Sequence, residues 1–176
     1  MPIPDFNGPT FVAFTDISGF IEMMKDDQRA ISALDRFYTS GFRILQASPS
    51  VHGAFISDCA ILFVNKQDTQ ETQLRSLLTV IEELNRQLLA HDIMLTTSIA
   101  YGLFSYYQRF EFEGIEKNAV YGNAYISAFL DNESHQPRLQ PGECRIVNHE
   151  LENQLVHNID RLWIGVSICT SIGWSP

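Results

Sequence analysis

The chain has 176 residues, of which 45% are hydrophobic and 19% are charged, a composition typical of one globular domain with its own core. Its 12 Lys and Arg against 21 Asp and Glu give a formal net charge of −9, which disfavours binding to nucleic acid or to an anionic membrane. No apolar run reaches the length of a membrane-spanning helix, and the first residues do not form a signal peptide. Three cysteines without metal-binding spacing suit a reducing compartment, so we expect a soluble, cytoplasmic protein.

The hydrophobic pattern predicts a short arm followed by alternating strands and helices. Residues 1–9 are rich in Pro and Gly and are expected to form the arm, and residues 10–176 a single domain. Strands are predicted at 10–15, 52–57, 59–65 and 93–101, and helices at 27–47 and 69–91. This β-α-β-β-α-β order is the ferredoxin-like split unit, which makes the fold class α+β.

A C-terminal extension follows this predicted core. Strands are expected at 103–112, 118–121, 143–147 and 161–169, and helices at 122–132 and 148–156. The sequence therefore predicts a ferredoxin-like βαββαβ core with an elaborated C-terminal part.

Two aspartates lie where this topology would bring them together. Asp16 ends the first predicted strand and Asp58 opens the third, and these two strands are antiparallel neighbours in a ferredoxin-like sheet. Two close carboxylates repel each other unless a cation lies between them or one binds a proton. Mg²⁺ or Mn²⁺ would satisfy this pair, because both ions accept oxygen ligands. The alternative is that each aspartate is an ordinary polar residue at a strand end or in a turn.

The turn after the first strand suits phosphate binding. Ile17, Ser18, Gly19 and Phe20 form a Gly-containing connection between a strand and a helix. Successive backbone N–H groups in such a turn can point at a phosphate. A metal pair beside such a turn would be equipment for phosphoryl transfer.

Four segments of the sequence follow one another in an order that matches a known family. They are Phe14–Phe20 (FTDISGF), Phe55–Phe63 (FISDCAILF), Thr97–Gly102 (TSIAYG) and Tyr121–Ala128 (YGNAYISA). Over roughly residues 10–150, this order resembles that of the class III nucleotidyl (adenylate/guanylate) cyclase catalytic domain, and in particular a bacterial group of small stand-alone cyclase-like domains. The resemblance implies a nucleotide cyclase-like α+β fold.

The resemblance also implies roles for individual residues. Asp16 and Asp58 would hold two divalent metal ions, Mg²⁺ or Mn²⁺, with the carbonyl of Ile17 completing one site, and residues 17–20 would bind the triphosphate. The ribose 3′-hydroxyl of a nucleoside triphosphate would attack the α-phosphorus, giving a 3′,5′-cyclic nucleotide and pyrophosphate. The family works as head-to-tail dimers, so a homodimer is implied.

The sequence departs from the family at several positions that normally act on the nucleotide. Ala54 and Ala119 stand where the family has its base-reading Lys and Asp, and Ile126 and Leu130 stand where it has a ribose-orienting Asn and a transition-state Arg. Asn123 is the nearest replacement for the missing catalytic Asn. Candidate replacements for the missing cation are Arg109, Lys117, Arg138 and Arg145.

Three hypotheses remain open at this point. The first is an active nucleotidyl cyclase with unusual base contacts, and it rests on the retained aspartates. The second is a catalytically degenerate nucleotide- and metal-binding regulatory module, and it rests on the missing Asn and Arg. A third is a different phosphoryl transfer at the same metal site.

Overall fold

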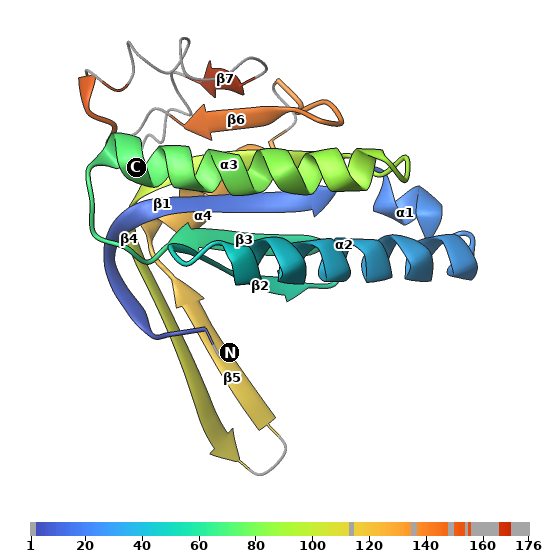
Figure 1. Ribbon diagram of the computed structural model, residues 1–176, viewed down its shortest axis with the longest axis horizontal. Coiled ribbons are helices and arrows are strands. Elements are labelled where there is room, and N and C mark those ends of the chain that lie inside the picture. The colour runs from blue at the N-terminus through green and yellow to red at the C-terminus, as the bar shows by residue number, and fades with distance from the viewer. Residues whose placement is uncertain are drawn as a thin grey trace.

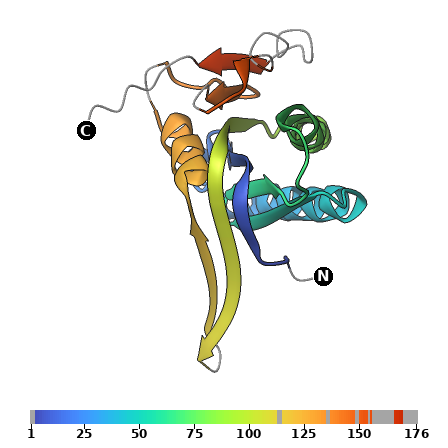
Figure 2. The same cartoon turned by 90° about the vertical axis from the view of Figure 1, so that its left-hand side faces the viewer.

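The computed structural model describes residues 3–112, 115–134, 137–147, 150–153, 155 and 166–169. Within these residues, a seven-stranded sheet carries two long helices on one face and a shorter helix on the other (Figure 1, Figure 2). The strands are β1 (Phe6–Ile17), β2 (Val51–Ile56), β3 (Cys59–Val64), β4 (Leu95–Phe112), β5 (Ile115–Tyr121), β6 (Cys144–Val147) and β7 (Val166–Cys169). The helices are α1 (Phe20–Met23), α2 (Asp27–Ala47), α3 (Gln70–Leu89) and α4 (Asn123–Asn132).

The sheet has the predicted ferredoxin-like order at its centre. The strands run in the order β2-β3-β1-β4-β6-β7, and β5 pairs with β4. β1 is antiparallel to both of its neighbours, β3 and β4, whereas β6 and β7 continue the sheet in parallel. The α+β fold class and the extended βαββαβ core are therefore confirmed.

Two predicted boundaries differ from the structure for one reason. β1 begins at Phe6, so residues 6–9, expected in the arm, belong to the strand. The strands predicted at 93–101 and 103–112 are one continuous strand, β4. The pairing of β1 with β4 runs unbroken from Ile17 opposite Leu95 to Phe6 opposite Tyr106, so each of these long strands supplies hydrogen-bond partners for the other.

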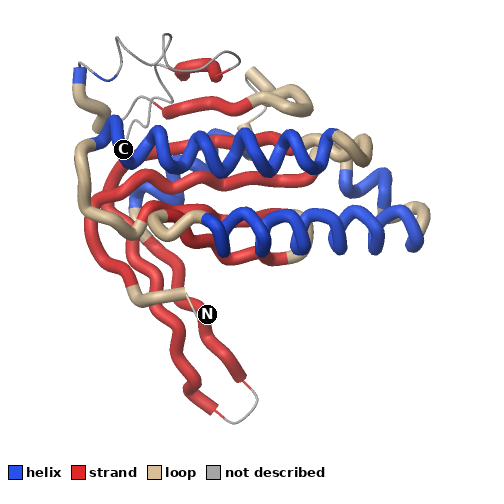
Figure 3. Tube along the Cα trace, viewed as in Figure 1, coloured by secondary structure: helices blue, strands red, loops and turns tan. Residues whose placement is uncertain are grey.

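Other differences are local. α1 was not predicted, because its four residues are too few to show a helical period. The helix predicted at 148–156 is only partly present, because residues 150–152 are not helical whereas 153 and 155 are, and 148, 149, 154 and 156 lie outside the described residues. The start of the strand predicted at 161–169 also lies outside them. Figure 3 shows β4 and β5 projecting together as a hairpin away from the helices.

The two long helices form where the sequence places an apolar stripe behind a capping residue. The carboxylate of Asp26 accepts hydrogen bonds from the N–H groups of Gln28 and Arg29, at 3.0 and 3.3 Å, and so caps α2. The hydroxyl of Thr69 accepts one from the N–H of Thr72 at 3.3 Å and caps α3. Both stripes cover one face of the sheet, with Phe37 of α2 and Leu77, Leu84 and Leu88 of α3 fully buried.

A buried ion pair attaches α4 to the sheet. The guanidinium of Arg145 on β6 donates to the carboxylate of Asp131 at 3.2 Å, and both side chains are almost completely buried. The same carboxylate accepts a hydrogen bond from the Ser98 hydroxyl on β4, and the guanidinium also donates to the Pro137 carbonyl at 2.9 Å. One charge network thus joins α4, β4, β6 and the segment after α4. None of the helices in the described part of the chain is long and apolar enough to span a bilayer.

Replacing Asp131 by Ala should destabilise the protein by about 3–5 kcal/mol, because the guanidinium of Arg145 would stay buried without its counter-charge. Urea unfolding followed by circular dichroism measures this loss. The double variant Asp131→Leu with Arg145→Met should recover most of the stability, since it removes both charges. A loss below about 1 kcal/mol for Asp131→Ala would show that the pair does not hold α4.

Candidate functional site

Asp16 and Asp58 meet at one end of the central strands. β1 and β3 are antiparallel, with Asp16 opposite Cys59, and the N–H of Ile17 donates to the carbonyl of Asp58 at 2.9 Å. This backbone hydrogen bond joins the end of β1 to the turn before β3, so the two aspartates lie at the same edge of the sheet. The structure therefore brings together the two carboxylates that the topology predicts to be neighbours.

The surroundings make ionisation of Asp16 unfavourable. Burial, the negative charge of Asp58 and that of Glu133, in this order of importance, raise the pKa of the Asp16 carboxyl from 3.8 to about 7. At neutral pH this carboxyl is therefore close to half protonated, a large departure for an aspartate. A bound cation would remove the penalty, because it attracts the charged form.

The aspartates line an open cavity of about 800 Å³. Its walls are the segment 16–22, Asp58, Thr96 of β4, the end of α4 at 132–134 and the segment 138–141. A space of this size accommodates a nucleotide-sized ligand. Its lining combines carboxylates, a strand-to-helix turn and one arginine, Arg138.

Two polar atoms in this lining have no hydrogen-bond partner. The hydroxyl oxygen of Ser18 and the side-chain amide nitrogen of Asn132 are both buried and unpaired among the described residues. Buried polar groups are normally paired, so each of these is a candidate contact for a ligand. Both lie within the same cavity as the aspartate pair.

The carboxylate pair suits a hard divalent cation that takes only part of its ligands from the protein. In the described part of the chain, no group of three or more His, Cys, Asp and Glu side chains is placed to hold a metal ion. Mg²⁺ commonly binds through one or two carboxylates and completes its shell with water and substrate phosphates. Asp16 and Asp58 with the Ile17 carbonyl therefore fit an ion that binds together with a phosphorylated substrate.

The turn expected to bind phosphate is partly committed to the fold. The N–H of Ile17 donates to Asp58 and that of Ser18 donates to the carbonyl of Met94, both at 2.9 Å. Gly19 takes a left-handed conformation with φ 74°, which glycine adopts without strain, and α1 starts directly after it. The N–H groups of Gly19 and Phe20 have no backbone acceptor in the described structure. Of the four backbone N–H groups expected to bind phosphate, these two are therefore available.

The proposed replacements for the missing cation lie in different places. Arg138 lines the aspartate cavity, whereas Arg145 is buried in its ion pair with Asp131. The side chains of Arg109 and Lys117 lie outside the described structure. Of the side chains that can be compared, Arg138 alone is placed to meet an anion beside the aspartates.

Asn123 lies at the opposite end of α4 from this cavity. Its side-chain amide donates to the carboxylate of Glu150 at 2.9 Å. The cavity is lined by the other end of the helix, at 132–134, about 13 Å away along the helix axis. Within one chain, Asn123 therefore does not reach the aspartate pair.

The two alanines at the family's base-reading positions also lie apart from the aspartates. Ala54 is on β2 opposite Ile61, and Ala119 is on β5 opposite Tyr107. Neither lines the cavity that contains Asp16. Their methyl groups offer no hydrogen bond with which to recognise a base.

Cys59 is the other reactive side chain beside the aspartates. Burial, followed by the charges of Asp58, Asp16 and Glu133, raises the pKa of its thiol to about 11. The sulfur donates to the carbonyl of Ile56 at 3.1 Å. At neutral pH the metal-free thiol is therefore protonated and does not act as a thiolate nucleophile.

The structure resembles solved nucleotide cyclase domains. The adenylyl cyclase CyaB from P. aeruginosa is 16% identical, covers 90% of this chain and 84% of its own, and has a TM-score of 0.61. The guanylate cyclase domain of RhGC from Catenaria anguillulae, solved with GTP, is 11% identical over 82% of this chain and 80% of its own, with a TM-score of 0.63. The dimeric guanylyl cyclase domain of RhoGC from Blastocladiella emersonii is 11% identical over 82% and 81%, with a TM-score of 0.62.

These likenesses establish the fold of adenylyl and guanylyl cyclase catalytic domains. No protein-family model matches the sequence, and no match was found among curated proteins. Identities this low do not carry over a substrate or an activity.

Asp16→Asn should stabilise the metal-free protein increasingly as pH rises from 5 to 8. The folded state holds the Asp16 proton up to about pH 7 and the unfolded state releases it near 3.8, so the wild-type carboxyl lowers stability over that interval. Asparagine cannot ionise, so the Asp16→Asn variant does not lose this stability as the pH rises. Urea-unfolding midpoints of both proteins in a metal chelator, at pH 5 and pH 8, measure the effect.

The matched control is Asp35→Asn, which removes the same charge from the exposed face of α2, outside the cavity. An advantage of Asp16→Asn that stays constant between pH 5 and pH 8 would contradict the raised pKa.

Proposed function

We propose that this protein is a divalent-metal-dependent nucleotidyl cyclase, which converts a nucleoside triphosphate into a 3′,5′-cyclic nucleotide and pyrophosphate. The observation that carries the proposal is the convergence of Asp16, Asp58 and the Gly19 turn in one cavity of a cyclase-type fold. A fold alone hosts many functions, so the proposal depends on this cavity.

In this proposal Asp16, Asp58 and the carbonyl of Ile17 hold Mg²⁺ or Mn²⁺. The bound metal would lower the pKa of the ribose 3′-hydroxyl and offset negative charge on the phosphates. The chain's own contribution is the burial and mutual repulsion that favour a cation at this edge of the sheet.

The phosphates are bound by backbone and side-chain donors around the metal pair. The N–H groups of Gly19 and Phe20 lie at the start of α1 and have no backbone acceptor among the described residues. Arg138 enters the same cavity from the segment after α4 and has no carboxylate partner in the described structure. We propose that this guanidinium replaces the missing family arginine from within the same chain, where it stabilises charge on the phosphates.

We further propose that the protein acts as a cytoplasmic homodimer. One neighbour was solved with GTP, which supports a nucleoside triphosphate substrate. The guanylyl cyclase domain of RhoGC was solved both as a non-canonical dimer and as a monomer, so support for a dimer comes from the position of Asn123. Since Asn123 lies about 13 Å along α4 from the cavity of its own chain, it could act only on the cavity of a second copy.

A degenerate nucleotide-binding module is the second candidate function. It is favoured by Ile126 and Leu130, which offer neither the amide nor the guanidinium of the family positions. A module of this kind would bind nucleotide with metal and be stabilised by it without forming product.

The cyclase proposal predicts a cyclic monophosphate from at least one of ATP, GTP, CTP and UTP in the presence of Mn²⁺ or Mg²⁺. Mass spectrometry of each reaction identifies the product and its base. Asp16→Ala and Asp58→Ala should each reduce the rate at least about a hundredfold, because they remove a metal ligand. Stabilisation by a nucleotide with no product from any of the four would instead support the binding module.

Arg138→Gln should lower kcat by roughly a hundredfold or more if the guanidinium acts on the transferring phosphates. Arg75→Gln is the matched control, because Arg75 is an exposed arginine of α3 that pairs with Glu71 at 3.0 Å. The measurement is the steady-state rate of each variant on the substrate identified above. Equal rates for both variants would show that Arg138 is a surface residue without a role in the reaction.

A further inference from the structure

The unpaired cations of the described chain are concentrated on one helix. Arg29, Arg36 and Arg43 of α2 form no ion pair with any described residue, even though acidic residues outnumber basic ones in this protein. The other described cations, apart from Arg138, all have a carboxylate partner: Lys25, Lys66, Arg75, Arg86 and Arg145.

The three arginines lie along a single line of the helix. They are seven residues apart, close to two full helical turns, so their side chains leave α2 on the same side. Successive members are about 10 Å apart along the helix axis. Like charges in such a row repel one another, and the row contributes nothing to the hydrophobic core.

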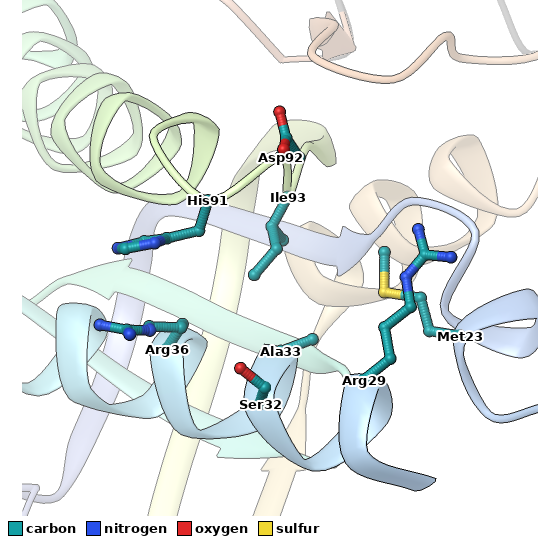
Figure 4. A pocket seen from close by; sticks show the side chains of 8 residues that line it. All are labelled: Met23, Arg29, Ser32, Ala33, Arg36, His91, Asp92 and Ile93. Carbon is teal, nitrogen blue, oxygen red and sulfur yellow. The ribbon is translucent and has the colours of Figure 1, made fainter. Parts of the chain in front are cut away.

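This row borders a groove between α2 and the end of α3. Two cavities of about 360 and 590 Å³ share Ser32, Arg36 and His91 in their walls and therefore adjoin, and we call the pair the groove. Arg29 lines the first cavity and Arg43 the second. Figure 4 shows the side chains of His91, from the turn after α3, and Arg36 extending in the same direction, whereas the guanidinium of Arg29 extends the opposite way, toward Met23.

The remaining lining favours an anion. The hydroxyl groups of Ser32 and Thr39 are hydrogen-bond donors in the groove, as a phosphate requires. Two carboxylates, Asp35 and Asp92, also lie in its walls, and Figure 4 shows the carboxylate of Asp92 pointing away from Arg36. Arg86 at the far wall is paired with Glu83 at 2.6 Å, which leaves the α2 row as the available positive charge.

The groove is separate from the cavity of the proposed reaction. No residue of its lining also lines the cavity that contains Asp16 and Asp58. A ligand in the groove therefore need not be the nucleotide that binds at the aspartates.

We propose that this groove is a second binding site, for a phosphorylated small molecule with at least two anionic groups. Guanidinium groups bind phosphate through paired hydrogen bonds, and the row presents them at intervals that one compact phosphate could not span. Both cavities have the size of small-molecule sites. An anionic membrane is the weaker fit, because the net charge of −9 repels it.

The test uses inorganic tripolyphosphate as the probe and isothermal titration calorimetry as the readout. The full chain is titrated in EDTA at physiological salt, so that no metal-dependent binding at the aspartates contributes. The wild-type protein should bind tripolyphosphate. Arg36→Gln should weaken the affinity for it by about tenfold or more, because the variant loses the charged hydrogen bonds from the guanidinium to the phosphate. Arg43→Gln should weaken the affinity as well, because Arg43 lines the larger cavity together with Arg36.

Two control variants distinguish binding in the groove from binding elsewhere on the protein. Arg75→Gln removes the same charge from α3 outside the groove and should bind like the wild type, as should Arg138→Gln, which removes the cation of the aspartate cavity. The proposal is overturned if the wild-type protein does not bind the probe, if Arg36→Gln binds as tightly, or if Arg75→Gln is equally weakened. It is also overturned if binding is lost in Arg138→Gln instead, or if the protein binds vesicles of anionic phospholipid but not tripolyphosphate.

Discussion

The antiparallel pairing of β1 with β3 is the constraint on which the candidate site depends. Its register places Asp16 opposite Cys59 and ties Ile17 to Asp58 by a backbone hydrogen bond. The same register buries apolar residues on both faces of β1, so a slip by one residue would turn each buried side chain to the opposite face. The core therefore fixes the position of the aspartates, although they contribute nothing to its apolar packing.

Asp131 and Asp16 are two acidic side chains that lie in opposite electrostatic environments. Asp131 is fully buried but has Arg145 as its counter-ion, and this pair secures the end of α4. Asp16 forms no ion pair with a described residue, and burial, followed by the charges of Asp58 and Glu133, raises its pKa. The first arrangement stabilises the fold. The second leaves the Asp16 carboxyl with a raised pKa that a bound cation would lower, and strongly shifted pKa values are common at functional sites.

The sequence predicted those parts of the structure that depend on local patterns. The apolar stripes of α2 and α3 and the strand order around Asp16 and Asp58 follow from hydrophobic period and topology. The sequence did not place Glu133 in the cavity and could not single out Arg138 from four candidate cations, because the segment after α4 is positioned by the tertiary contacts of Arg145 with Asp131 and Pro137. The groove on α2 was also missed, although the seven-residue spacing of its arginines is visible in the sequence.

Metal binding at the aspartate pair is the central claim, and titration with Mn²⁺ followed by electron paramagnetic resonance tests it most directly. The wild-type protein should bind Mn²⁺ at pH 8, and about tenfold more weakly at pH 6, because a carboxyl with a pKa of about 7 is then mostly protonated. Asp58→Asn should lose this binding at both pH values. Binding that is unchanged in Asp58→Asn, or absent from the wild type, would contradict the account.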